Sequence, residues 1–129
     1  MPIDAIGTPV TLPDGTPVPL SKAVRAGDFV LLSGQLAFGT NGSIVAGGIQ
    51  AQTRQCLENA KQVLTDAGCS LSDVVKTTIW LTDPGDFTSF NSVYAEYFPT
   101  PAPARSAVCS ALMVTGACVE IELLVFCPG

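Results

Sequence analysis

The chain has 129 residues, of which 47% are apolar and 13% charged, with a net charge of −5 and no histidine. This composition excludes a disordered chain, lacks the basic stripe that nucleic acids and anionic membranes require, and offers no imidazole for Ser-His, Cys-His or His-metal sites. A single domain spanning residues 1–129 leaves about a third of its unfolded surface exposed, so with this few charges we expect it to bury apolar surface against copies of itself.

The first half of the chain predicts a lead-in, a hairpin and a helix. Residues 1–17 are interpreted as an extended lead-in, because glycine and proline cluster from Gly7 onward. Strands are expected over 21–25 and 29–32, joined by a turn at 26–28. Apolar residues at steps of three and four predict an amphipathic helix over 49–67, with Gly68 as its C-cap.

The second half alternates strands and a helix. Residues 74–82 are rich in β-branched and aromatic side chains and predict a strand, whereas aromatic residues at helical spacing predict a helix over 86–98. Three prolines within 99–103 favour an extended connector. Further strands are expected over 106–112 and 118–126. The order β-β-α-β-α-β-β predicts an α+β domain with both helices on one face of the sheet.

Two charged features do not suit a plain core. Arg105 is one of three arginines and stands between the proline connector and an apolar strand. Glu120 and Glu122 share a face of the last strand with Leu124 and Phe126, which suggests a half-buried cleft or a subunit interface. A surface ion pair or a solvated sheet edge is the alternative. A tight turn near 114–116 would not set Arg105 directly opposite Glu120.

The cysteines indicate a reducing compartment. Their number is odd and no C-x-x-C pair occurs, so we expect neither a metal site nor a disulfide framework. The five are Cys56, Cys69, Cys109, Cys118 and Cys127. The N-terminal residues carry an acid, no basic residue and no long apolar run, unlike a signal peptide, and no stretch suits a membrane span. We therefore expect a cytoplasmic protein whose cysteines are reduced.

Six short motifs follow one another between residues 18 and 126. They are S-G-Q at 33–35, Q-x-x-Q-x-L-x-N at 52–59, VVKTTIWL at 74–81, F-x-x-x-N-x-x-Y-x-x-Y-F from 87 to 98, PARSAV at 103–108 and VEIE at 119–122. In this order and spacing the chain resembles the Rid (YjgF) family of reactive-intermediate imine and enamine deaminases. The resemblance implies a chorismate-mutase-like fold, with a mixed sheet and two helices on one face, assembled as a homotrimer. It also implies that 2-imino or enamine acids are hydrolysed to 2-keto acids and ammonia in clefts between subunits, without metal or cofactor.

The resemblance assigns roles to individual residues. Arg105 corresponds to the arginine that holds the substrate carboxylate, which a planar guanidinium does through two parallel hydrogen bonds. Glu120 corresponds to the glutamate that positions the attacking water and moves its proton. Ser33 and Gly34 match a segment whose backbone approaches the substrate, where the glycine leaves space because it has no Cβ. Asn91 matches a polar residue near the cleft, although a helix-surface amide explains it equally.

Two positions depart from the family pattern. Leu20 stands where many members have the tyrosine of a P-Y-S motif, and Ala107 stands where cysteine is common. An apolar wall at Leu20 favours a bulkier or more apolar imine. Because a fold does not fix a function, two alternatives stay open: a non-catalytic trimer that binds small carboxylates or a partner, and a pathway-specific enzyme acting on a larger substrate. The nuclease activity proposed for parts of the family is disfavoured by the acidic charge and the lack of histidine.

Overall fold

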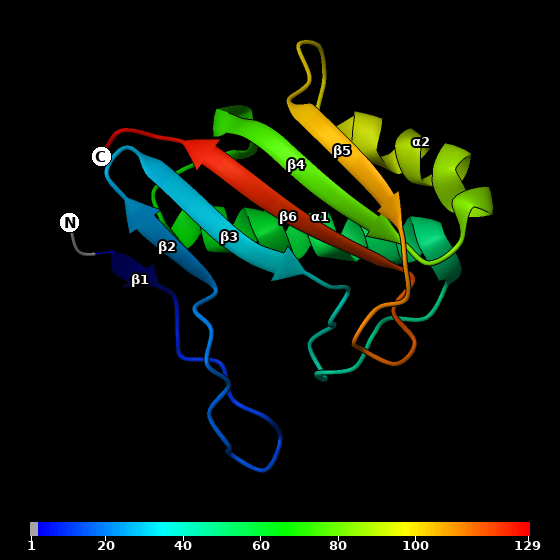
Figure 1. Cartoon of the computed structure of the whole chain (residues 1–129), viewed down its shortest axis with the longest axis horizontal. Helices are drawn as coiled ribbons and strands as arrows, with labels where there is room; N and C mark the ends of the chain where they lie inside the picture. The colour runs from blue at the N-terminus through cyan, green and yellow to red at the C-terminus, as the bar shows by residue number, and fades with distance from the viewer. Residues whose placement is uncertain (1–2) are drawn as a thin grey trace.

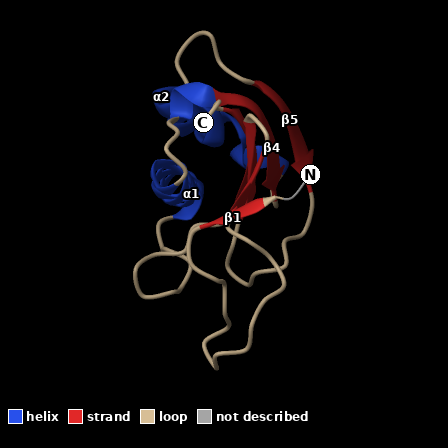
Figure 2. Ribbon diagram, turned by 90° about the vertical axis from the view of Figure 1, so that its left-hand side faces the viewer, coloured by secondary structure: helices blue, strands red, loops and turns tan. Residues whose placement is uncertain are grey.

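Two helices cover one face of a six-stranded sheet in the computed structural model, which describes residues 3–129 (Figures 1 and 2). The strands are β1 (Asp4–Ile6), β2 (Ala23–Ala26), β3 (Phe29–Gln35), β4 (Val74–Leu81), β5 (Ala104–Cys109) and β6 (Val119–Phe126). The helices are α1 (Gly48–Asp66) and α2 (Phe87–Tyr97). Two short 3₁₀ turns flank β4: η1 (Leu71–Asp73) precedes it, and η2 (Pro84–Asp86) follows it and leads into α2. The expected α+β class, with both helices on one face, is confirmed.

The order of strands across the sheet is β1-β2-β3-β6-β4-β5. β4 and β5 run parallel and every other pair is antiparallel, so the sheet is mixed. β4 lies between β5 and β6. β5 and β6 therefore do not pair with each other, as they would if a tight turn near residues 114–116 joined them in a hairpin. β5 also begins two residues earlier than the strand expected from residue 106.

β1 lies within the expected lead-in and pairs with β2. No sequence pattern predicts it, because three residues are too few to show an alternation. The hairpin between β2 and β3 matches its prediction, and its turn contains Gly27 at a φ of +61°. Neither α1 nor α2 is long and apolar enough to cross a membrane.

The core lies between the helices and the sheet. Alternate residues of β6 point toward the helices and are fully buried, as are one side of α1 and one side of α2. Each such leucine or phenylalanine contributes roughly 1.5–3 kcal/mol when removed from water. α1 ends as expected at Gly68, whose φ of +77° lets Cys69 N donate to Leu64 O at 2.8 Å.

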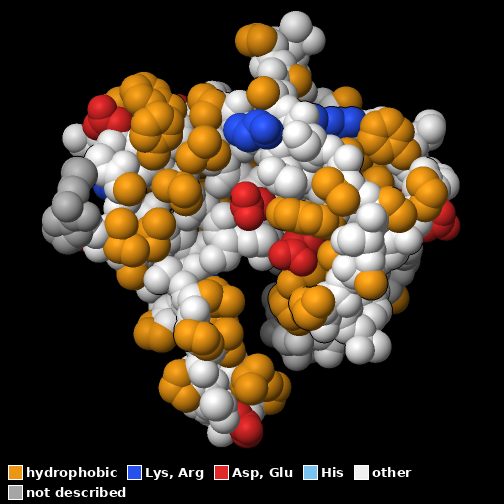
Figure 3. Space-filling view, in the orientation of Figure 1, with side chains coloured by type: hydrophobic (Ala, Val, Ile, Leu, Met, Phe, Trp, Pro, Cys, Tyr) orange, Lys and Arg blue, Asp and Glu red, His pale blue; other side chains and the backbone are white. Residues whose placement is uncertain are grey.

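The opposite face of the sheet carries no helix (Figure 2). Phe29, Leu31 and Phe126 lie on this open face and stay 42–45% exposed, with the two phenylalanine rings in edge contact at 5.3 Å. Figure 3 shows apolar side chains gathered toward one end of this face, with carboxylates near its middle. The apolar surface expected from the low charge is therefore present here.

Two amides of α1 attach loops to the helix. Gln52 is 6% exposed; its Nε2 donates to Gly116 O at 3.0 Å and its Oε1 accepts from Cys118 N at 2.9 Å. Asn59 Nδ2 donates to the carbonyls of Leu36 and Phe38, both at 3.0 Å. These bonds fix the chain just after β3 and just before β6.

Replacing Gln52 with alanine should lower the free energy of unfolding by about 2 kcal/mol, because two backbone groups lose their partners. Urea denaturation measures this loss. Gln62→Ala is the matched control, since Gln62 bonds only to Asp66 on the exposed side of the same helix and should change stability by less than about 0.5 kcal/mol. Equal effects of the two substitutions would contradict the role given to Gln52.

Candidate active site

Glu120 and Gly34 meet on the open face of the sheet. The pairing of β3 with β6 is irregular between Leu32 and Gln35, which is where Ser33 and Gly34 stand. A Cβ on Gly34 would overlap the Glu120 carboxylate. The glycine is therefore required here to make room for a side chain of this chain, in addition to any substrate.

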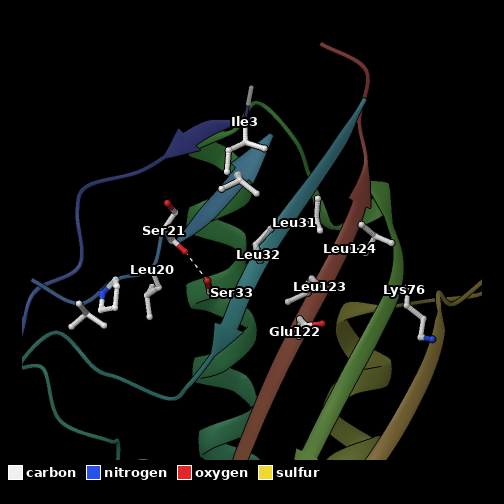
Figure 4. Close-up of a pocket in the computed structure, with 13 residues that line it drawn as sticks. Ile3, Leu20, Ser21, Leu31, Leu32, Ser33, Lys76, Glu122, Leu123 and Leu124 are labelled. Carbon is white, nitrogen blue, oxygen red and sulfur yellow. Dashed lines mark hydrogen bonds between the residues drawn. The ribbon is translucent and has the colours of Figure 1, made fainter. Parts of the chain in front are cut away.

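Ser33 ties the segment before β2 to β3. Its hydroxyl donates to Ser21 O at 2.6 Å, and its backbone N donates to Lys22 O at 3.0 Å. Leu20, at the end of that segment, is 47% exposed. Both Leu20 and Ser33 line a hollow of about 840 Å³ on the open face. Figure 4 shows them on one side of this hollow, with Lys76 on the other side.

The Glu120 carboxyl is half-buried in a partly apolar setting. Trp80 lies directly opposite it on β4, and the loop after β5 adds Leu112 and Met113 to the same small hollow of about 160 Å³. Burial raises the pKa of Glu120, and the negative charge of Glu122 raises it further. A carboxyl perturbed in this way exchanges a proton nearer to neutral pH than an ordinary glutamate does.

Arg105 belongs to a second group of residues, at the β5 edge. β5 pairs with β4 so that Arg105 stands beside the buried Thr77 and therefore points to the helix face. Its Nη2 donates to Asn91 Oδ1 on α2 at 2.6 Å. Asn91, which the sequence explained equally as a surface amide, thus contacts the arginine directly.

Three aromatic rings of α2 lie around the guanidinium. Arg105 Cζ lies 5.4 Å from the ring centre of Phe87, 5.8 Å from that of Phe90 and 4.9 Å from that of Tyr94. Tyr94 is fixed in turn, because its hydroxyl shares a 2.7 Å hydrogen bond with Thr77 Oγ1 and burial raises its pKa. The helical spacing of these rings predicted α2. It did not predict their contact with Arg105, because β5 and α2 are brought together only when the whole sheet folds.

Ala107 lies two positions after Arg105 on the same strand face. With Phe87 and Leu81 it lines a separate hollow of about 320 Å³. The small side chain leaves this apolar hollow open next to the arginine. Ala107 therefore belongs with the Arg105 group and not with the Leu20 hollow.

Arg105 and Glu120 of one chain do not meet. Arg105 points to the helix face, whereas Glu120 points to the open face, and β4 separates their strands. Two strand spacings and a three-residue offset along the strands put their Cα atoms roughly 14 Å apart. The chain thus carries two groups of candidate residues: Leu20, Ser33, Gly34 and Glu120 in one, and Asn91, Arg105 and Ala107 in the other.

Neither group contains a set of side chains suited to a metal ion. Among residues 3–129, the one group of three such ligands is Cys69, Asp73 and Cys127, at a different place in the fold. The chemistry available at the two candidate groups is that of a guanidinium and a carboxyl with a raised pKa.

The chain matches the family described as Endoribonuclease L-PSP over residues 15–127. It is 43% identical over 116 residues to 3-aminoacrylate deaminase RutC of Acinetobacter baylyi, covering 87% of this chain and 92% of that protein. It is 38% identical over 105 residues to human 2-iminobutanoate/2-iminopropanoate deaminase, covering 81% and 77%. The crystal structure of RidA from an Antarctic Psychrobacter superposes with a TM-score of 0.84 at 37% identity, covering 95% of this chain and 98% of that one. Two further relatives are named as mitochondrial and chloroplastic, in Schizosaccharomyces pombe and Arabidopsis thaliana.

The substitution Glu122→Gln should lower the pKa of Glu120. The neighbouring negative charge disfavours the Glu120 carboxylate, so removing it makes deprotonation easier and moves the titration to lower pH. Nuclear magnetic resonance of the side-chain carboxyl carbons against pH measures the shift. The matched control is Glu58→Gln, on α1, which should leave the Glu120 titration unchanged. An upward shift in Glu122→Gln, or none, would contradict this account of the electrostatics.

Proposed function

Because the chain belongs to the Endoribonuclease L-PSP family, also known as the Rid, YjgF or RutC family, we propose that it hydrolyses a small 2-imino or enamine acid to the 2-keto acid and ammonia. One observation carries the proposal. Arg105 is half-buried among aromatic rings, held by Asn91, and forms no ion pair with a carboxylate of residues 3–129. A charge fixed in this way is available to the carboxylate of a substrate.

The proposed site lies between two copies of the chain, in a homotrimer. One copy supplies Arg105 and Asn91, and the next supplies Glu120, Gly34 and the Leu20 wall. The separation of these groups on opposite faces of one sheet supports this arrangement. The exposed apolar residues of the open face supply surface for the contact, and cyclic symmetry repeats the site three times.

In the proposed reaction, Arg105 binds the substrate carboxylate with two parallel hydrogen bonds. Asn91 and the aromatic rings hold the guanidinium in place before the substrate arrives, so little side-chain entropy is lost on binding. This orients the imine carbon toward the carboxyl group of the neighbouring copy.

Glu120 moves the proton. Its carboxylate accepts a proton from water while the water oxygen bonds to the carbon of the protonated imine and the carbon–nitrogen π electrons move to nitrogen, giving a neutral carbinolamine. The glutamic acid then returns the proton to nitrogen. The carbon–nitrogen bond breaks as the carbinolamine hydroxyl gives its proton to the Glu120 carboxylate, so the keto acid and ammonia leave and the ammonia takes up that proton. The raised pKa of Glu120 suits a group that must both accept and donate.

The Leu20 wall shifts the proposed substrate toward apolar side chains. Leu20 offers no hydroxyl, and the Ser33 hydroxyl is already donated to Ser21 O, so this side of the hollow binds by apolar contact. The same observation favours a second candidate, a trimer that binds small carboxylates without turnover.

An acidic chain without histidine argues against the ribonuclease activity in the family's description. The cytosolic location stays a prediction, since relatives are named from organelles.

Hydrolysis is tested with imino acids generated in the cuvette by an amino-acid oxidase. Arg105→Lys should lower kcat/KM more than about tenfold, because lysine keeps the charge but not the planar pair of donors. Arg54→Lys is the control, since Arg54 pairs with Glu96 at the exposed surface. Binding of 2-ketobutyrate by a wild type that hydrolyses no imino acid in the panel would establish the second candidate instead.

Gly34→Ala should lower turnover by about tenfold to a hundredfold, because the added methyl displaces the Glu120 carboxylate. Stability should change little, since the atom displaced is the end of a flexible side chain. Steady-state kinetics and urea denaturation measure the two effects. In a Glu120→Gln background the alanine should add no further loss of turnover. A full additional loss there would show that Gly34 acts independently of Glu120.

A further inference from the structure

Two cysteines lie together at the end of the sheet remote from the proposed active site. Cys69 follows Gly68 at the end of α1, and Cys127 follows the last residue of β6. Their sulfurs and a carboxylate oxygen of Asp73 all lie within 4.8 Å of one another. Glu120 stands seven residues before Cys127, which is about 23 Å along an extended strand. The pair includes no residue of the two candidate groups, so this inference does not rest on the function proposed above.

Arg25 of β2 joins the two segments that carry the thiols. Its Nη1 donates to Cys127 O at 2.7 Å, and its Nη2 donates to Ala67 O at 3.3 Å and to Cys69 Sγ at 3.8 Å. Cys127 N donates to Asp28 O at 2.8 Å. Both segments are thus held in place, and the positive charge of Arg25 lies against the Cys69 sulfur, where it favours the Cys69 thiolate.

A metal ion is the first alternative for two thiols and a carboxylate. Two features oppose it. Asp73 Oδ2 already accepts from Ser70 N at 2.9 Å, as part of the capping box at the start of η1. The guanidinium of Arg25 contacts Cys69 Sγ, where it repels a divalent cation but stabilises a thiolate. The surroundings therefore favour chemistry between the two thiols.

We propose that Cys69 and Cys127 form a reversible disulfide when a small-molecule disulfide such as oxidised glutathione accumulates. The Cys127 thiolate attacks the glutathione disulfide, forming a mixed disulfide and releasing one glutathione thiolate, which takes up the proton. Cys69, once deprotonated, attacks the Cys127 sulfur and releases the second glutathione. The two protein thiols are oxidised to one disulfide, and the glutathione disulfide is reduced to two thiols.

The order of attack follows from the surroundings. Burial raises the pKa of Cys69 to about 11, with a further contribution from the neighbouring Cys127. The Cys69 sulfur is also more buried than that of Cys127, so glutathione reaches Cys127 first. Cys69 is therefore the resolving thiol, which attacks only a sulfur already placed beside it. A disulfide needs the sulfurs about 2 Å apart, so side-chain movement closes a gap of less than about 3 Å.

The remaining cysteines do not match this arrangement. Cys56 is fully buried, and burial raises its pKa strongly. Cys109 is exposed, and its sulfur contacts the Thr82 carbonyl at 3.7 Å. Cys118 is half-buried near Cys56, and burial raises the pKa of both thiols, so this neighbouring pair resists ionisation. The proposed bond is therefore specific to Cys69 and Cys127. It would fix the segment after β6 covalently to the end of α1 and close a long loop, which restricts the unfolded chain.

The experiment incubates the reduced, chelator-treated protein with oxidised glutathione, then blocks free thiols with N-ethylmaleimide under denaturing conditions. Intact mass should show three blocked cysteines and one internal disulfide, and peptide mapping should place it between Cys69 and Cys127. The melting temperature should rise by several degrees and fall back after reduction. Cys69→Ser should stop at a stable glutathione adduct on Cys127.

Cys109→Ser is the matched control and should form the same disulfide at the same rate as wild type. Five blocked cysteines in wild type, a disulfide that involves another cysteine, or a bond between chains would overturn the proposal. So would a glutathione adduct on Cys127 that persists although Cys69 is present. A cadmium titration of the same chelator-treated protein covers the metal alternative. Two results together would overturn the disulfide and assign a metal site instead. The first is thiolate-to-cadmium absorption that saturates at one equivalent and is lost in Asp73→Asn. The second is that no disulfide forms in the glutathione experiment.

Discussion

The constraint on which the proposed function depends is the register of β4 with its two neighbours. Thr77 pairs with Arg105 and Trp80 pairs with Glu120, and these two positions of β4 point to opposite faces of the sheet. The guanidinium therefore lies against α2, while the carboxyl lies on the open face. One copy of the chain presents two incomplete halves, and a reaction that needs both groups needs a second copy.

Contacts within one chain hold each catalytic group of the proposed site in position before substrate binds. Asn91 and three aromatic rings hold Arg105 without neutralising it. On the other face, the missing side chain of Gly34 leaves space for the Glu120 carboxyl. The α1 amides of Gln52 and Asn59 fix the loops on which these positions depend. The scarce polar groups of an apolar chain are thus concentrated where they hold the backbone or face the proposed substrate.

Much of this fold follows from local sequence pattern. The 3.6-residue period of α1, its end at Gly68 and the alternation in β6 each need only neighbouring residues, and each prediction is confirmed within one or two positions. The insertion of β4 between β5 and β6 depends on contacts between distant segments, which periodicity does not encode. For that reason the sequence identified Arg105, Asn91 and Glu120 as candidates without showing how they are arranged. It showed neither that Arg105 contacts Asn91 nor that Glu120 lies on the opposite face of the sheet.

The central claim, that each site combines Arg105 of one copy with Glu120 of the next, is tested most directly by mixing two inactive variants. Arg105→Ala and Glu120→Gln chains are unfolded together in equal amounts, refolded and assayed with an imino acid. About three quarters of the resulting trimers are mixed, and each has one intact site of three, so activity should return to about a quarter of the wild-type value. Activity that stays at the level of the separate variants, although mixed trimers are present, would contradict a shared site.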